Sequence, residues 1–364
     1  MKIGEVVDYL NSLAPPVLQQ SYDNSGLLLG DPGAELTGVL IALDVTEAVI
    51  GEAVNKGLNL VVSHHPLIFE GLKSLTGADY VEKAVIQAIQ HRVAVYAMHT
   101  NLDVLYNGVN RRICEKLGLT QLRVLSPRRH LLRKLVTFVP VSYADKVREA
   151  VFSAGAGTIG NYNQCSFNIT GQGSFRGSEN TNPFAGEKGK LSFEDEIRIE
   201  TIFPSYLEKT VIEALLSVHP YEEVAYDIYP LDNAFDRIGE GMTGILITPL
   251  EAIPFLQHVK TVFSCASIRY AGPDDKPIRT VAVCGGSGGF LIPEAIRQKA
   301  DAFISSDFRY HQFFTAENKI LIADIGHHES EQFSKEIIFE FLTKKYSTFA
   351  IHFSEIITNP VKYL

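Results

Sequence analysis

Apolar runs alternate with helical patterns along roughly the first third of the chain. Strands are expected at the apolar runs 38–44, 58–63 and 93–98, and helices at the periodic segments 46–56, 78–90 and 108–117. Continuous apolar runs between helices are typical of parallel strands that are covered on both faces. The pattern therefore predicts an α/β fold built on a parallel sheet.

The last third of the chain repeats this pattern. We expect strands at 279–283, 302–306, 319–326 and within 347–355, and helices at 292–299 and 331–345. The glycine run at 284–289 lacks the Lys-Ser/Thr of a phosphate-binding loop and the GxGxxG spacing. It is therefore interpreted as a tight strand-to-helix turn. Its backbone N–H groups could still bind an anionic group of a substrate at the start of the helix.

The middle of the chain has a different pattern. Strands are expected at 132–140, 165–176, 196–204 and 224–231, and helices at 143–154 and 206–218. This β-α-β-β-α-β order is that of the ferredoxin-like unit. A chain of 364 residues exceeds what one core usually holds. We therefore expect a sheet-based domain at 1–126 and 236–364, with a ferredoxin-like domain at 127–235 inserted into it.

Histidine and acidic residues follow the ends of several expected strands. Ligands in open α/β sheets bind beyond the carboxyl ends of the strands, so these residues are expected to meet at one edge. They are His64 and His65, His99 and Asp103, His327, His328 and Glu331, Asp44 and Asp307. The convergence predicts a metal site, although a single His-His pair is more often a surface or helix-capping pair and the segment 99–103 alone is also typical of a local turn.

The residue types indicate which metals such a site would take. Mixed histidine and carboxylate ligands without cysteine suit Zn²⁺, Mn²⁺, Fe²⁺ or Co²⁺. Neighbouring histidines on an extended strand exit point in opposite directions, so the pair at 64 and 65 would serve two ions or flank one shared site. His327 is favoured over His328 because it lies four residues before Glu331, which puts both on one face of a helix.

Composition narrows the classes of partner. The net charge of -9 disfavours non-specific binding of nucleic acid, and a basic cluster within 123–134 reads as a solvated surface or a local anion patch. The four cysteines form no CxxC pair, so neither a zinc-thiolate site nor a disulfide framework is expected. No signal peptide and no apolar stretch of membrane-spanning length is present, which predicts a soluble, cytoplasmic protein.

Several segments together resemble a known family. They are residues 22–32, 42–46, 63–69, 99–103, 108–110, 284–288, 305–311 and 326–331, with 219–227 in the middle domain. The chain resembles the Nif-three-like proteins, often labelled GTP cyclohydrolase 1 type 2 homologues, in their long bacterial form. Two departures are Tyr22 where the family usually has tryptophan, and Ser306-Asp307 in place of a Ser-Gly-Asp type motif.

The resemblance implies a dinuclear metal site, an oligomer and a domain type. Two divalent ions would share five protein ligands, with Glu331 as the bridge between them. Zn²⁺ is the first candidate, and Mn²⁺, Fe²⁺, Co²⁺ and Mg²⁺ are alternatives. The implied ligands are His64, His65, Asp103, His327 and Glu331. It also implies a toroidal homohexamer whose inserted domain is similar to PII and CutA modules.

Two functions follow as expectations. The first is a metal-dependent hydrolase acting on a nucleotide or phosphoester-like small molecule, with Asp44, Asp307 or His311 orienting ligands or carrying protons. The second is a metal-containing regulatory protein that binds a ligand or nucleic acid without turnover.

Overall fold

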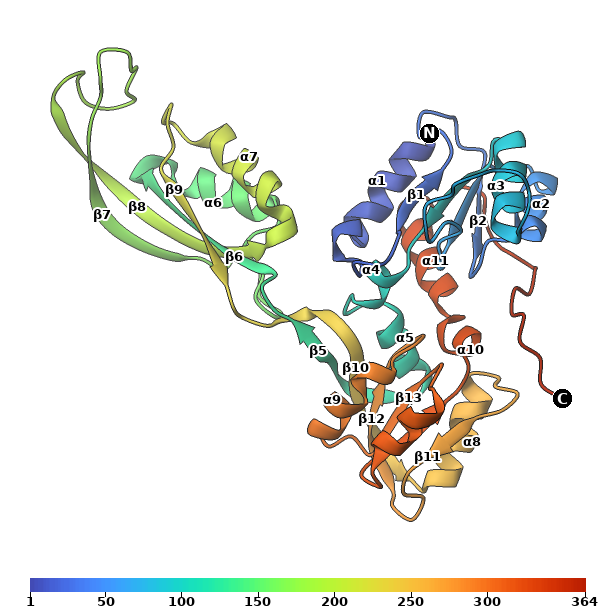
Figure 1. Ribbon diagram of the computed structural model, residues 1–364. Helices are drawn as coiled ribbons and strands as arrows, with labels where there is room; N and C mark the ends of the chain where they lie inside the picture. Colours follow the sequence, from blue (N-terminus) through green and yellow to red (C-terminus); the bar gives the residue numbers. More distant parts are fainter. The chain divides into compact units, whose positions relative to one another are not determined.

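The computed structural model describes all residues from 1 to 364, and they divide into two compact units (Figure 1). Unit 1 comprises residues 1–126 and 238–364, and unit 2 comprises residues 127–237. Unit 2 is thus continuous in sequence, whereas unit 1 is assembled from both flanks of the chain. None of the helices combines the length and apolar character needed to span a lipid bilayer.

The first sheet of unit 1 has five strands in the order β1-β4-β3-β2-β15. The strands are β1 (Gly26–Leu29), β2 (Val39–Ala42), β3 (Leu60–Ser63), β4 (Ala94–Ala97) and β15 (Ile351–Phe353). Neighbouring strands from β4 to β15 are parallel, as the apolar runs predict, and β1 adds an antiparallel edge. Every residue of β2, β3 and β4 is buried, because helices cover both faces.

The helices around this sheet form two layers. One layer holds α2 (Glu47–Asn55) and α3 (Tyr80–Gln90), which share a buried apolar cluster with the sheet. The other holds α1 (Ile3–Leu13), α5 (Val109–Lys116) and α11 (Ser334–Lys345). Two further helices are short. Helix α4 (Thr100–Asp103) precedes α5 in the chain, and helix α10 (His327–Glu331) precedes α11.

The second sheet of unit 1 has six strands in the order β11-β14-β13-β12-β10-β5. They are β5 (Leu119–Arg128), β10 (Phe235–Leu250), β11 (Arg269–Ala271), β12 (Ile278–Val283), β13 (Ala302–Ser305) and β14 (Leu321–Asp324). The three central strands β12, β13 and β14 are parallel. Helix α8 (Ala252–Val262) packs in the apolar cluster that this sheet shares with the first sheet. Helix α9 (Ile292–Arg297) packs in a second apolar cluster, which contains residues of β12, β13 and β14.

Two features of unit 1 differ from the expectation. The helix expected at 331–345 begins earlier, at His327. A turn at residues 332 and 333 divides it into α10 and α11. The strands β1, β5, β10 and β11 were not expected. Burial is mixed along β1, β5 and β10, and no residue of β11 is buried.

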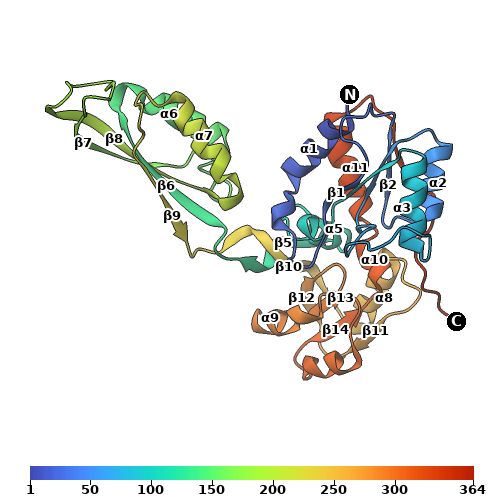
Figure 2. The same cartoon turned by 45° about the horizontal axis from the view of Figure 1, so that its top comes forward.

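Unit 2 has the element order β-α-β-β-α-β that the sequence predicts. Its elements are β6 (Leu132–Pro140), α6 (Ala144–Ser153), β7 (Phe167–Arg176), β8 (Leu191–Pro204), α7 (Glu208–Val218) and β9 (Tyr226–Leu231). The strands form an antiparallel sheet in the order β7-β8-β6-β9. Both helices pack on one face of this sheet, where residues of β6 and β8 meet α6 and α7 (Figures 1 and 2).

Gly108 tests how tightly α4 is held. A Cβ atom at this position would lie 1.9 Å from the carbonyl oxygen of Leu102, a backbone atom that cannot move without α4. We expect Gly108→Ala to lower the free energy of unfolding by about 1–3 kcal/mol through overpacking. Urea unfolding measures this change.

Gly71→Ala is the matched control, because a Cβ atom there meets nothing within 4 Å. Equal stability of the two variants would show that the backbone contact at Gly108 does not constrain the fold.

Candidate metal centre

Three strand exits of unit 1 bring histidine and acidic side chains together. His64 and His65 follow β3, Asp103 ends the short helix α4 after β4, and α10 after β14 carries His327 and Glu331. The first three residues come from one sheet and the last two from the other. Helix α10 lies between the two sheets (Figures 1 and 2). The structure therefore brings together all five residues that the family resemblance implies as ligands.

Glu331 occupies the centre of this cluster. Its Oε2 lies 2.8 Å from Nε2 of His65, 2.9 Å from Nε2 of His327 and 3.7 Å from Nε2 of His64. Nε2 of His64 is also 3.6 Å from Oδ1 of Asp103. Two candidate ligand sets share Glu331: His64 and Asp103 complete one, and His65 and His327 complete the other.

The outer nitrogen of each histidine ring is held by an acceptor. Nδ1 of His65 hydrogen-bonds Oδ1 of Asp44 at 2.6 Å, and Nδ1 of His327 hydrogen-bonds Oδ2 of Asp307 at 2.6 Å. Nδ1 of His64 donates to the carbonyl oxygen of Met98 at 2.8 Å. Because Nδ1 carries a proton in this arrangement, Nε2 is the nitrogen available to a metal ion, and Nε2 faces the centre in all three rings. Such histidines are prepared to bind a cation.

The electrostatics of the centre also favour a bound cation. Nε2 of His64 and Oδ1 of Asp103 are both buried and have no hydrogen-bond partner. Such orphaned polar atoms are rare in folded proteins and call for an explanation, which an ion would supply. Burial and the charge of Glu331 raise the pKa of Asp103 to about 8. The residues therefore fit divalent cations.

The protonation of the other groups has the same origin. Burial disfavours the charged form of His65, but its hydrogen bonds to Asp44 and Glu331 outweigh this and raise its pKa to about 9. Asp307 and Glu331 likewise overcome burial at His327 and raise its pKa to about 11. Burial opposes ionisation of Glu331, yet its close contacts with His327 and His65 and the nearby ring of His64 hold its pKa well below the usual range. Protons thus occupy the positions that a cation would compete for.

Two residues of the sequence analysis lie outside this cluster. His311 was expected as a candidate orienter or proton carrier, but it is exposed on the 3-10 helix at Tyr310–Ala316, where its ring packs against Tyr310 and Phe314. His328 belongs to neither ligand set around Glu331, and its Nδ1 is buried without a partner. The rings of His64 and His65, expected to serve two ions or flank one site, have centroids 5.0 Å apart and both approach Glu331.

The structure adds two residues to the five predicted ligands, and of these only His99 was expected at this edge of the sheet. His99 forms a third candidate group with His64 and His65, and its Nδ1 hydrogen-bonds Oδ1 of Asp23 at 2.7 Å. The signal for His99 was its place directly after an apolar run. Thr358, near the C-terminus, donates its hydroxyl to Oδ2 of Asp44. Nothing in the local sequence pattern marks Thr358.

The glycine run after β12 serves a close approach. Gly286 has φ +63°, and a Cβ atom there would lie 2.2 Å from Oε1 of Glu331. The neighbouring Gly285 donates its N–H to Oδ1 of Asn110 at 2.9 Å. The run is therefore a turn that leaves space for the central carboxylate.

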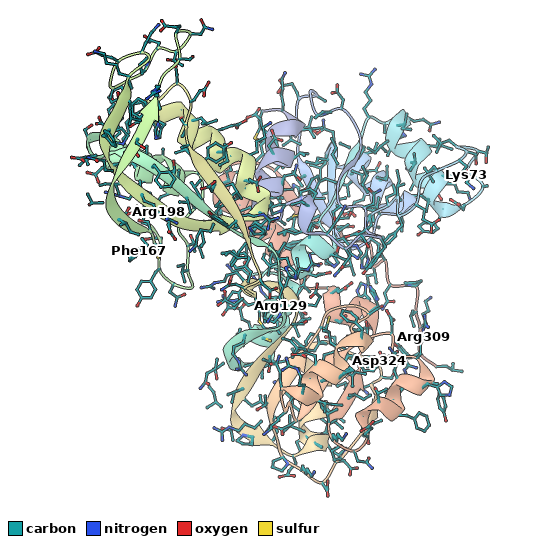
Figure 3. The ribbon with its side chains drawn as sticks, turned by 60° about the vertical axis from the view of Figure 1, so that its left-hand side comes forward. Lys73, Arg129, Phe167, Arg198, Arg309 and Asp324 are labelled. Carbon is teal, nitrogen blue, oxygen red and sulfur yellow. The ribbon has the colours of Figure 1, made fainter.

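A cavity of about 800 Å³ opens onto the centre. Its lining includes the exposed rings of Tyr22, Phe69, Tyr80 and Phe290, together with Arg269. The rings of Tyr22 and Phe69 are stacked with centroids 6.5 Å apart, and Phe69 also meets the edge of His99. Arg269 is paired with Asp324, the last residue of β14, which Figure 3 labels.

Known proteins resemble this chain over its whole length. It is 39% identical to a protein of Halalkalibacterium halodurans and 37% identical to one of Bacillus subtilis, both named GTP cyclohydrolase 1 type 2 homolog; the first match covers 100% of both chains, the second 99% of this chain and 98% of the relative. A crystal structure of a Bacillus cereus protein related to NIF3 superposes with a TM-score of 0.88 at 38% identity, covering 100% of this chain and 99% of that chain.

The family comparison agrees with these relatives. The Duf34/NIF3 (NGG1p interacting factor 3) family matches residues 1–360. A Staphylococcus aureus protein of known structure gives a TM-score of 0.78 at 28% identity, with 100% of this chain and 99% of that chain covered. The chain therefore belongs to the Duf34/NIF3 family.

Proposed function

We propose that the cluster around Glu331 holds two divalent metal ions, with Zn²⁺ as the first candidate and Mn²⁺, Fe²⁺, Co²⁺ and Mg²⁺ as alternatives. His64, Asp103 and Glu331 would hold one ion, and His65, His327 and Glu331 the other. The observation that supports this most strongly is one buried carboxylate shared by two ligand sets, because carboxylate oxygens bridge paired ions in two-metal sites. Imidazole and carboxylate ligands without thiolate suit this group of metals.

We propose further that the centre hydrolyses a nucleotide or phosphoester-like small molecule. Two bound divalent ions supply Lewis-acid polarisation of a phosphoryl or carbonyl oxygen and lower the pKa of water. Asp44 and Asp307 keep His65 and His327 in the correct tautomer and orientation. The stacked pair Tyr22 and Phe69 offers an apolar surface for a planar ring beside the centre. The name printed for the relatives, GTP cyclohydrolase 1 type 2 homolog, is compatible with such a substrate.

Metal content tests the shared carboxylate. Protein purified without chelator should carry about two ions per chain, and Glu331→Gln should lose both because each ligand set includes this residue. Plasma mass spectrometry measures the stoichiometry.

Glu329→Gln is the matched control, since Glu329 is also buried in α10 but belongs to neither ligand set. Loss of one ion only from Glu331→Gln, or equal loss from both variants, would contradict the shared position.

Thr358 tests the support of His65 from the C-terminal segment. Its hydroxyl donates to Asp44, whose other oxygen holds Nδ1 of His65. Thr358→Val removes this hydrogen bond at nearly constant volume, and we expect Zn²⁺ affinity to fall by roughly 10-fold. Competition with a chromophoric chelator measures the affinity.

Thr358→Ser keeps the hydroxyl and should bind Zn²⁺ as the unaltered protein does. If the valine and serine variants bound equally, the C-terminal segment would have no part in holding the metal.

Turnover separates the hydrolase from the regulatory alternative. The metal-loaded protein should hydrolyse at least one member of a panel of nucleotides and phosphodiesters, and the Glu331→Gln variant should not. Product formation is followed by chromatography, beside isothermal titration with the same panel. Tight, metal-dependent binding of a panel member without turnover would refute the hydrolase and favour the regulatory protein.

A further inference from the structure

Unit 2 contains a cavity that is separate from the metal centre. Its volume is about 610 Å³, which lies within the range of about 300–1,000 Å³ typical of small-molecule sites. Four aromatic side chains line it, those of Phe138, Phe175, Phe184 and Tyr221. None of the candidate metal ligands lines it.

The cavity lies on the sheet face that the helices leave open. Side chains alternate along β8, and Ile197 and Ile199 belong to the apolar cluster under α6 and α7. Glu196 and Arg198 therefore point to the opposite face, where both line the cavity. Figure 3 labels Arg198 on this strand. Gly171 of β7 is the strand partner of Glu196, so no side chain covers the carboxylate from that position.

Glu196 is a buried acid with little compensation. Glu196 is only 8% exposed, and the hydroxyl of Tyr221 donates a hydrogen bond to Oε1 of Glu196 at 2.8 Å. Burial and the neighbouring Glu196 raise the pKa of Tyr221, which keeps this hydroxyl protonated as a donor. Oε2 faces Gly173, where a Cβ atom would approach to 2.3 Å. The strand thus carries glycine where any other residue would displace the carboxylate.

The nearby cation does not offset this charge. Arg198 pairs with Glu200 at 2.8 Å, and Glu200 also pairs with Lys134 at 3.0 Å, so these three groups form their own network. The cavity lining contains two further acids, Glu222 and Glu223, and one further cation, Arg176, so that three acids face two cations. A buried carboxylate costs free energy unless a partner of opposite charge or several donors meet it. The excess of negative charge inside an aromatic lining defines the chemistry of the missing partner.

We propose that this cavity binds a small organic cation, an ammonium group carried on an apolar or aromatic body. The ammonium would meet Glu196, and the faces of Tyr221, Phe175 and Phe184 would surround the rest of the ligand. Rings of this kind attract cations through their negative faces, and aromatic pockets that recognise ammonium groups use the same interaction. Tyr221 lies 6.3 Å from Phe175 and 6.0 Å from Phe184 between ring centroids, so the three rings form one wall.

The segment 219–223 gains a role in this way. Nε2 of His219 hydrogen-bonds the carbonyl oxygen of Phe138, and Nδ1 of His219 accepts the N–H of Tyr221. The carboxylate of Glu222 accepts the N–H of Asn182 at 2.8 Å, which fastens the long connection between β7 and β8. This segment therefore positions Tyr221 against Glu196 and keeps Phe184 at the cavity.

Isothermal titration of the full-length protein tests the proposal. The first probes share one body and differ in charge: phenethylamine, 2-phenylethanol and 3-phenylpropionate. We expect phenethylamine to bind at least about 10-fold more tightly than the other two, because only it forms a charged hydrogen bond with Glu196. Tryptamine, agmatine, spermidine and choline extend the set of amines.

The variant Glu196→Gln should lose the preference for phenethylamine, while Glu213→Gln should keep it. Glu213 is the matched control because it is exposed on α7, outside the cavity. Circular dichroism checks that Glu196→Gln is folded, and Phe184→Leu, which keeps the carboxylate, should weaken amine binding independently.

Three results would overturn the proposal. They are no heat from any amine, equal affinity for the three probes, and equal behaviour of the two glutamine variants. If no amine gives heat, sedimentation velocity tests whether a second copy of the chain occupies this face instead. In that case Glu196→Gln would change the sedimentation coefficient.

Discussion

The carboxylate of Glu331 is only 2% exposed and faces three imidazole rings, and the other candidate ligands are arranged around its charge. A buried carboxylate is stable only with close partners of opposite charge or with several donors. Nε2 of His64 and Oδ1 of Asp103 nevertheless stay unpaired beside it. The protein thus carries more buried polar groups at this point than it satisfies by itself, which is the property expected of a metal site.

The distances in this cluster depend on the packing of two sheets. Glu331 and His327 come from the sheet that contains β14, and the other ligands come from the sheet that contains β3 and β4. Residues of both sheets, together with α5, α8 and α11, belong to one apolar cluster. Since that cluster joins residues before and after unit 2, the centre forms only when both flanks of the chain have folded together. The insertion of unit 2 is compatible with this because its ends join two neighbouring strands, β5 and β10.

The parts predicted from sequence are those that one local pattern determines. Fully buried parallel strands such as β2, β3 and β4 are continuous apolar runs, and the polar residues that follow them were singled out for the same reason. The i, i+4 spacing of His327 and Glu331 lies within α10, as expected. Strand β10 was missed because its burial is mixed along its length.

Contacts between distant segments could not be predicted in this way. Asp23 reaches His99, and Thr358 reaches Asp44, across long separations in sequence that no periodicity records. His311 belongs to the segment 305–311 of the family resemblance and was expected to orient ligands or carry protons, yet the chain continues after Asp307 into an exposed 3-10 helix. Chain direction after a strand is a tertiary property, so residues further from a strand end are placed less well by pattern alone.

The central claim is that Glu331 is shared by two metal ions, and anomalous X-ray scattering from crystals grown with Zn²⁺ tests it most directly. The account predicts two anomalous peaks beside Glu331, one contacting His64 and Asp103 and the other contacting His65 and His327. A single peak, or two peaks of which only one touches Glu331, would contradict it.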